Sequence, residues 1–183
     1  MGIFDMSSFN LDQFIQQLRD VATQPEASDQ VKSIMKQAFQ NPEAVKQAMS
    51  GYEGGEEILF EDETVSIWYC RFDPDIHVPP HNHKTQATIG VYDGEELNHF
   101  YLPKDGRLEQ KTTRSLKPGD VLSMGPDAIH SVESANSKAT YGIHVYLAAL
   151  STISRSLYDW DSGEALPMED ELFNRMQRVS AIN

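Results

Sequence analysis

Short segments rich in β-branched and aromatic residues follow one another from residue 57 to residue 148, and turn-forming residues separate them. They lie at 57–61, 65–72, 85–92, 96–102, 108–116, 120–124, 129–134 and 139–148. The turns between them include Asp93-Gly94, Lys104-Asp105-Gly106, Lys117-Pro118-Gly119-Asp120 and Gly125-Pro126-Asp127. Strands at intervals of about 8 to 12 residues, without helices between them, are typical of a sandwich or a closed barrel. We therefore expect a mostly β fold, a jelly roll or a related barrel, over residues 53–150.

The segment before the strands has a helical pattern. Its apolar residues recur at helical spacing: Leu11, Phe14, Ile15, Leu18 and Val21, then Val31, Ile34, Met35 and Ala38. Asn10 is the expected N-cap of the first helix, and Asn41-Pro42 begins a third helix that ends before Gly51. We expect residues 1–52 to form short helices packed on one face of the barrel. Residues 151–183, with one helical stretch at 169–178, are expected to extend the same domain.

The net charge of −13 narrows the range of partners. Binding to nucleic acid or to an anionic membrane surface depends on clustered Lys and Arg, so we expect neither partner. The chain has one cysteine, Cys70, so no intrachain disulfide can form, as suits a reducing compartment. The start MGIFDMSSFN lacks the basic and apolar regions of a signal peptide, and we expect a cytoplasmic protein, a monomer or a homodimer.

The segment Pro79-Pro80-His81-Asn82-His83 carries the strongest chemical signal. On a strand, residues i and i+2 point to the same side, so His81 and His83 could offer two imidazoles to one metal ion. His130 and His144 each lie in a later apolar run. A buried histidine usually needs a partner, and a metal ion would satisfy several histidines at once.

The spacing of these residues resembles the cupin superfamily. Its first motif, G-x5-H-x-H-x3,4-E-x6-G, matches His81, His83 and Gly94, with Ala87 at the glutamate position and Asp75 at the first glycine. Its second motif, G-x5-P-x-G-x2-H, matches the spacing from Gly119 to His130. The resemblance implies a double-stranded β-helix that holds a divalent metal ion with His81, His83 and His130.

Within the cupins, three histidines without the glutamate resemble the cysteine dioxygenase-type thiol dioxygenases. The resemblance implies Fe(II), with Zn, Ni or Mn as other possible occupants, and a small thiol and O2 as substrates. Those enzymes carry a Ser-x-His-x-Tyr strand in the substrate pocket, which matches Gly142, His144 and Tyr146. By resemblance, His144 would orient Tyr146, and the phenol would hydrogen-bond the substrate or a bound oxygen species.

Three positions depart from that pattern. Gly142 replaces the serine, and Ala87 replaces the cysteine that animal enzymes cross-link to the pocket tyrosine. The arginine that binds the substrate carboxylate is missing from the stretch 56–59. Arg71 is the candidate replacement, although an outward, solvated arginine is the more common case, and Gln86 is a second candidate for substrate binding. His77 and His99 are expected in loops or at the surface, and Trp68 in the core.

Two other functions stay open at this point. An iron cupin dioxygenase that cleaves a carbon–carbon bond in a diketone-like substrate would suit three histidines and need no thiol. A cupin that binds a small molecule through its metal without turnover, or a Zn(II) hydrolase, is also physically reasonable. The pair His144 and Tyr146 favours the enzyme, because a bare binding site needs no second polar layer.

Overall fold

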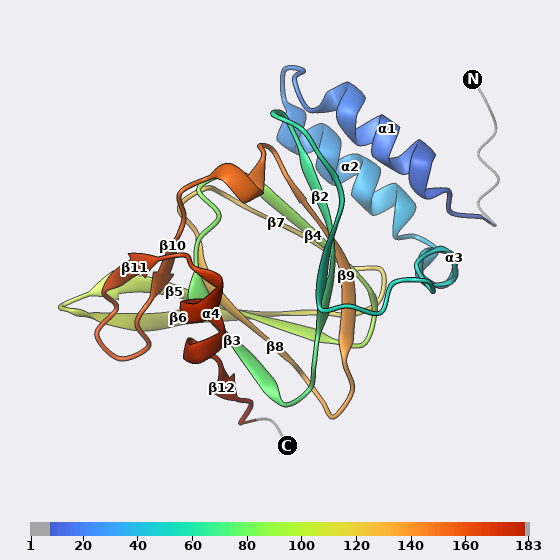
Figure 1. Ribbon diagram of the computed structural model, residues 1–183. Coiled ribbons are helices and arrows are strands. Elements are labelled where there is room, and N and C mark those ends of the chain that lie inside the picture. Colours follow the sequence, from blue (N-terminus) through green and yellow to red (C-terminus); the bar gives the residue numbers. More distant parts are fainter. Residues whose placement is uncertain (1–7, 182–183) are drawn as a thin grey trace.

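The computed structural model describes residues 8–181, and two antiparallel sheets face each other at its centre (Figure 1). Sheet A has the order β1 (Glu56–Glu61), β2 (Ser66–Phe72), β9 (Thr140–Tyr146), β4 (Ala87–Asp93), β7 (Val121–Met124). Sheet B has the order β11 (Ala165–Pro167), β10 (Ser156–Tyr158), β3 (Ile76–His81), β8 (Ile129–Ser134), β5 (Glu96–Lys104), β6 (Arg107–Leu116), and β12 (Arg178–Val179) also pairs with β3. The expected mostly β jelly roll with helices at its N-terminal side is confirmed. The expectation about a signal peptide falls mainly on residues 1–7, which lie outside the described range.

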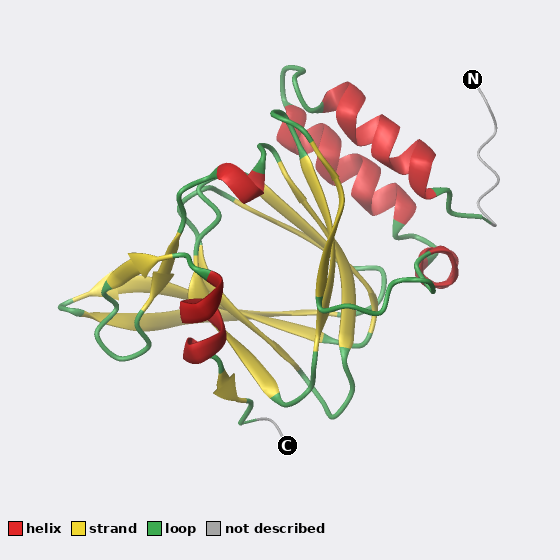
Figure 2. Cartoon of the chain, viewed as in Figure 1, coloured by secondary structure: helices red, strands yellow, loops and turns green. Residues whose placement is uncertain are grey.

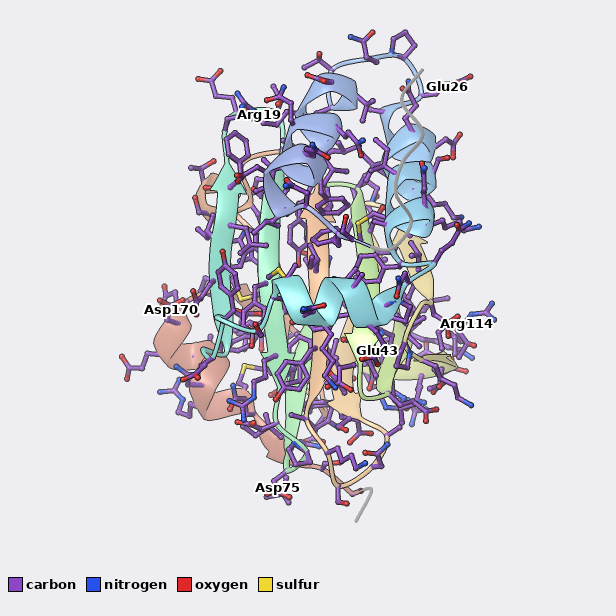
Figure 3. All side chains as sticks on the ribbon, turned by 90° about the vertical axis from the view of Figure 1, so that its right-hand side faces the viewer. Arg19, Glu26, Glu43, Asp75, Arg114 and Asp170 are labelled. Carbon is purple, nitrogen blue, oxygen red and sulfur yellow. The ribbon has the colours of Figure 1, made fainter. Side chains whose placement is uncertain are left out.

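Three helices cover the outer face of sheet A, as Figures 2 and 3 show. They are α1 (Leu11–Val21), α2 (Ala27–Ala38) and α3 (Pro42–Ala48). The Asn10 side chain accepts a hydrogen bond from the Gln13 N–H, as expected of an N-cap. The helices pack closely on β4, because a Cβ built on Gly90 would lie 2.7 Å from the Phe39 ring. No helix within residues 8–181 is long and apolar enough to cross a membrane.

Strand alternation divides the residues of sheet A between two environments. On β9, Ile143 and Val145 face the helices, whereas His144 and Tyr146 face sheet B. Both faces of β4 and β9 are therefore buried, which explains why these segments are apolar almost throughout. The inner face of sheet A forms one wall of the candidate site.

The chain after β9 runs across the edge of sheet B. A short 3-10 helix (Leu150–Thr152) leads to β10, and α4 (Asp170–Met176) follows β11. Leu157 on β10 pairs with His81, and Val179 on β12 pairs with Ile76, so both segments add to β3. Figure 1 shows α4 and β12 next to β3, and this arrangement places the C-terminal segment beside the barrel opening.

Candidate metal centre

A β-bulge in β3 determines where His81 points. Val78 pairs with Val132 and His81 pairs with His130, so three steps along β3 match two steps along β8. The extra residue falls at Pro79-Pro80, where the missing N–H groups cost no ladder hydrogen bond. Without the bulge, simple alternation would place His81 on the opposite face from Val78. The two prolines therefore turn His81 into the barrel, where Val78 and His130 also lie.

His83 reaches the same place from a loop. The expectation that His81 and His83 share one strand is wrong, because β3 ends at His81 and His83 precedes β4. Between them, Asn82 is fully buried and pairs with the C-terminal segment. Its Nδ2 donates to the Tyr158 hydroxyl at 2.8 Å, and its Oδ1 accepts from the Ser156 N–H at 3.0 Å. Asn82 thus anchors the loop that carries His83.

One backbone oxygen and one side-chain oxygen set the ring orientations of His81 and His130. His81 Nδ1 lies 2.8 Å from the Pro79 carbonyl oxygen, which can only accept, so Nδ1 carries the proton. His130 Nδ1 lies 2.8 Å from Asn98 Oδ1. Asn98 is itself oriented, because its Nδ2 donates to Glu96 at 2.7 Å. In both rings Nε2 is consequently left with a free lone pair.

The three histidines form a buried cluster. Every pair of their candidate ligand nitrogens lies within 4.8 Å, and the ring centroids are 4.6 to 5.0 Å apart. Two ring nitrogens of the cluster, His130 Nε2 and His83 Nδ1, are buried without a hydrogen-bond partner. Such orphaned atoms are rare in a folded protein unless they bind an ion or water. The donor set therefore fits a divalent metal ion.

Burial keeps these imidazoles uncharged. It lowers the pKa of His81 to about 4 and lowers the pKa values of His83 and His130 well below the usual range. Only a neutral imidazole offers a lone pair to a metal ion. At neutral pH all three residues are ready to act as ligands.

His144 and Tyr146 form a second polar layer behind the cluster. His144 Nδ1 lies 3.2 Å from the Tyr146 hydroxyl, and the Tyr146 ring contacts His83 at a centroid distance of 4.9 Å. His144 Nε2 faces Glu96 Oε2 at 4.0 Å. Burial lowers the pKa of His144 to about 3, so its ring is neutral.

A cavity of about 110 Å³ connects these groups. Its lining combines the histidines and Tyr146 with an apolar wall and three charged residues: Trp68, Phe72, Val78, Val132, Leu150, Met168 and Phe173, then Glu56, Arg155 and Asp170. Arg155 is half-buried, and its positive charge adds to the effect of burial in lowering the pKa values of His81 and His83. The C-terminal segment supplies Arg155, Met168, Asp170 and Phe173, so it closes one side of the cavity.

Two of the expected substrate-binding residues lie elsewhere. Arg71 follows Tyr69 on the outer face of β2, where it pairs with Asp73 at 2.6 Å and lines a groove beside α3. Its expected place in the substrate pocket is corrected, because strand alternation directs it away from the barrel. Gln86 is half-buried before β4, its carbonyl accepts from the Leu147 N–H, and it does not line the cavity.

The positions of His77 and His99 also differ from the expected loop or surface positions. They lie on β3 and β5, on the outer face of sheet B, with Glu133 between them. His99 is 9% exposed, and its Nε2 lies 2.9 Å from Glu133 Oε1. The Ser180 hydroxyl donates to the other carboxylate oxygen at 2.6 Å, and Trp160 covers His77. These residues form a hydrogen-bonded cluster, not a loop surface.

Sequence reasoning missed Arg155 and Glu96. Arg155 lies outside the barrel strands, and no local pattern connects it to the histidines. Glu96 left a signal in the sequence, because alternation along β5 places it on the same face as Asn98 and Phe100. A charged residue on an inward face is uncommon and indicates a partner or a function.

Comparisons with known proteins concern the fold alone. No protein-family model and no curated protein matches the chain. A cupin superfamily protein from Desulfitobacterium hafniense is 18% identical, with a TM-score of 0.42 over 51% of this chain and 75% of that chain. A protein with a double-stranded β-helix domain from Klebsiella pneumoniae is 18% identical, with a TM-score of 0.42 over 58% of this chain and 86% of that chain.

An enzyme is also among the similar structures. The DMSP lyase DddQ from Ruegeria pomeroyi is 14% identical, with a TM-score of 0.44 over 54% of this chain and 48% of that chain. The match thus spans about half of the lyase. The chain has two facing antiparallel sheets with a buried cluster of three histidines.

Proposed function

We propose that the chain is a non-haem Fe(II) thiol dioxygenase that converts a small anionic thiol and O2 into a sulfinate. The observation that carries this proposal is the donor set of three buried, neutral imidazoles with no carboxylate in the cluster. A divalent ion held by neutral ligands keeps its full charge, which favours an anionic ligand such as a thiolate. When bound, the Fe(II) ion would lower the pKa of the thiol and bring thiolate and O2 together.

The overall reaction needs no further reagent. In RSH + O2 → RSO2H the O–O bond breaks and two S–O bonds form. Sulfur loses four electrons and the two oxygen atoms gain them. The protein therefore has only to bind the thiol, orient it and exclude water.

The residues around the cluster suit these tasks. Arg155 is the cation of the cavity wall, and a guanidinium binds a carboxylate through paired N–H donors. The Tyr146 ring contacts the His83 ring, and its hydroxyl is hydrogen-bonded to His144, so the phenol can hydrogen-bond the bound substrate. The apolar wall formed by Trp68 and Phe72 limits the entry of water.

The test is anaerobic purification with metal analysis, followed by O2 uptake with cysteine, cysteamine, 3-mercaptopropionate and mercaptosuccinate. We expect about one iron per chain, thiol-dependent uptake and a sulfinate product. His81→Ala should lose both iron and uptake, because it removes one of three ligands. The control is Arg114→Gln, exposed on β6 and outside the cavity, which should keep both.

Two outcomes would overturn the proposal. Uptake with acetylacetone but with no thiol would indicate carbon–carbon bond cleavage. Iron-loaded protein that consumes no O2 with any of these compounds would indicate a binding protein without turnover.

A further inference from the structure

Glu96 is a buried carboxylate with one oxygen unused. The side chain is fully buried on the inner face of β5. Its Oε1 accepts from Asn98 Nδ2 at 2.7 Å, whereas Oε2 has no hydrogen-bond partner. Burial raises the pKa of Glu96 to about 7, and the hydrogen bond from Asn98 opposes this effect. An unpaired carboxylate oxygen in the interior is costly, so a partner is expected.

The group that faces Oε2 is also unpaired. His144 Nε2 is buried without a hydrogen-bond partner and lies 4.0 Å from Glu96 Oε2. This distance is too long for a hydrogen bond, but a small side-chain rotation or one water molecule would close it. Burial raises the pKa of the Cys70 thiol, and the negative charges of Glu56 and Glu96 raise it further. Closing the gap would satisfy both orphaned atoms.

No residue on β9 itself can approach His144 Nε2 in this way. Gly142 is the neighbour of His144 on the inner face of the strand. A Cβ built on Gly142 would lie 2.7 Å from the Gly90 carbonyl oxygen, so a side chain does not fit there without a backbone shift. Gly142 therefore supplies no partner for His144 Nε2, and the carboxylate that faces this atom is Glu96 on the opposite sheet.

We propose that Glu96 is a positioning residue that fixes the tautomer of His144 and thereby the direction of the hydrogen bond with Tyr146. The ionised carboxylate can only accept, so His144 Nε2 carries the proton and Nδ1 keeps a lone pair. The Tyr146 hydroxyl then donates to Nδ1, and its oxygen lone pairs face the cavity. The consequence for a substrate rests on the proposed function, whereas the tautomer does not.

Glu96 is also connected to the histidine cluster through Asn98. Asn98 donates to Glu96 Oε1 and accepts from His130 Nδ1, so the orientation of His130 depends on Glu96 as well. One residue thus connects a candidate metal ligand with the polar layer behind it. This double connection gives the buried carboxylate a role in positioning both histidines.

The hydrogen-bond pattern gives a sharp test with Glu96→Gln. Asn98 Nδ2 donates to the Oε1 position, so the glutamine oxygen has to occupy that position. Its NH2 group then faces His144 Nε2 and donates to it, which moves the His144 proton to Nδ1. The variant is nearly isosteric, so the fold should persist.

The measurement is ¹⁵N NMR of the histidine rings in the full chain at pH 8.5, freed of paramagnetic iron, with His144→Gln to assign the signals. We expect the Nε2–H tautomer of His144 in the wild type and the Nδ1–H tautomer in Glu96→Gln. Glu133→Gln, a buried carboxylate on the outer face of sheet B, is the matched control and should leave the His144 signals unchanged.

Activity gives a second readout. We expect kcat for the preferred thiol to fall about 10- to 100-fold in Glu96→Gln, with KM little changed. If His144 has the same tautomer in both proteins, the role of Glu96 is overturned whatever the activity. If the tautomer changes but no thiol is oxidised, the positioning role of Glu96 is supported and the proposed function fails.

Discussion

The cavity wall contains one cationic side chain that the barrel strands do not supply. Arg155 comes from the segment after β9, whereas the stretch 56–59 at the start of the barrel has no arginine. Glu56 and Asp170 also line the cavity. In a chain with a net charge of −13, a single arginine at the site would decide whether an anionic substrate enters.

Replacing Arg155 by glutamine should affect carboxylated thiols selectively. We expect KM for 3-mercaptopropionate to rise about 10- to 100-fold, because the substrate loses a hydrogen bond between charged groups. KM for cysteamine, which has no carboxylate, should not rise. Arg114→Gln is the control, because Arg114 is exposed on β6 and does not line the cavity. Equal changes for both thiols would show that Arg155 does not contact the carboxylate.

At the level of elements, the site depends on two irregularities next to each other. The bulge at Pro79-Pro80 turns His81 inward, and the loop after β3 brings in His83. The loop is held from outside the barrel, because Asn82 pairs with Ser156 and Tyr158 of the C-terminal segment. The histidine cluster is thus coupled to β10, an element that contributes no residue to the cluster.

Asn82→Ala should weaken metal binding without removing a ligand. Both side-chain hydrogen bonds of Asn82 are lost, so the loop no longer holds His83 in place. We expect the dissociation constant for Fe(II) or Zn(II) to rise about 10- to 100-fold, as for other residues that orient metal ligands. Tyr158→Phe removes one of the two bonds and should have a smaller effect. Unchanged affinity, measured by competition with a chelator, would show that the loop is held by other contacts.

At the scale of the whole molecule, the two sheets are covered differently. Helices α1 to α3 protect the outer face of sheet A, and the C-terminal segment covers part of sheet B (Figure 2). There His77, His99 and Glu133 meet Trp160 and Ser180. The C-terminal segment therefore closes the cavity on one side and caps a buried cluster on the other.

Acidification should destabilise the metal-free protein. Burial lowers the pKa of His77 to about 4, and those of His81 and His144 to about 4 and about 3, against 6.5 in the unfolded chain. The unfolded chain then binds more protons, so stability falls as pH drops from 6.5 toward 4, by up to about 1.4 kcal/mol per pH unit for each group. Glu96 has the opposite effect on stability. Burial raises its pKa to about 7, so the folded state binds the proton at a higher pH than the unfolded chain does.

Urea unfolding of the metal-free chain at pH 7.5 and pH 5.5 measures whether the free energy of unfolding falls on acidification. We expect a lower free energy of unfolding at pH 5.5, because the lowered pKa values of several histidines outweigh the raised pKa values of Glu56 and Glu96. His77→Gln should reduce the difference between the two pH values. The fluorescence of Trp160 beside His77, recorded in a Trp68→Phe background, reports on the C-terminal segment. Equal free energies at both pH values would contradict the assignment of buried, neutral histidines.

The sequence by itself determined the fold class and the residues that meet in the cluster. Regular short strands and turn residues are local patterns, and each depends on only a few neighbouring residues. The grouping of His81, His83 and His130 was expected from the resemblance of their spacing to the cupin motifs. The helical segment was equally clear, because Leu18 and Met35 recur on apolar helix faces. The strands and helices could be predicted because backbone periodicity decides which residues share a face, whereas His81 points into the barrel only because of the bulge in β3.

Only the tertiary structure decided what surrounds the cluster. The bulge in β3, the anchoring of Asn82 and the entry of Arg155 all depend on pairing between segments more than 45 residues apart along the chain. Arg71 shows the limit of local reasoning, since its strand face was predictable but the environment of that face was not. Which of two faces becomes the cavity depends on the packing of sheets and helices, and no local pattern encodes that choice.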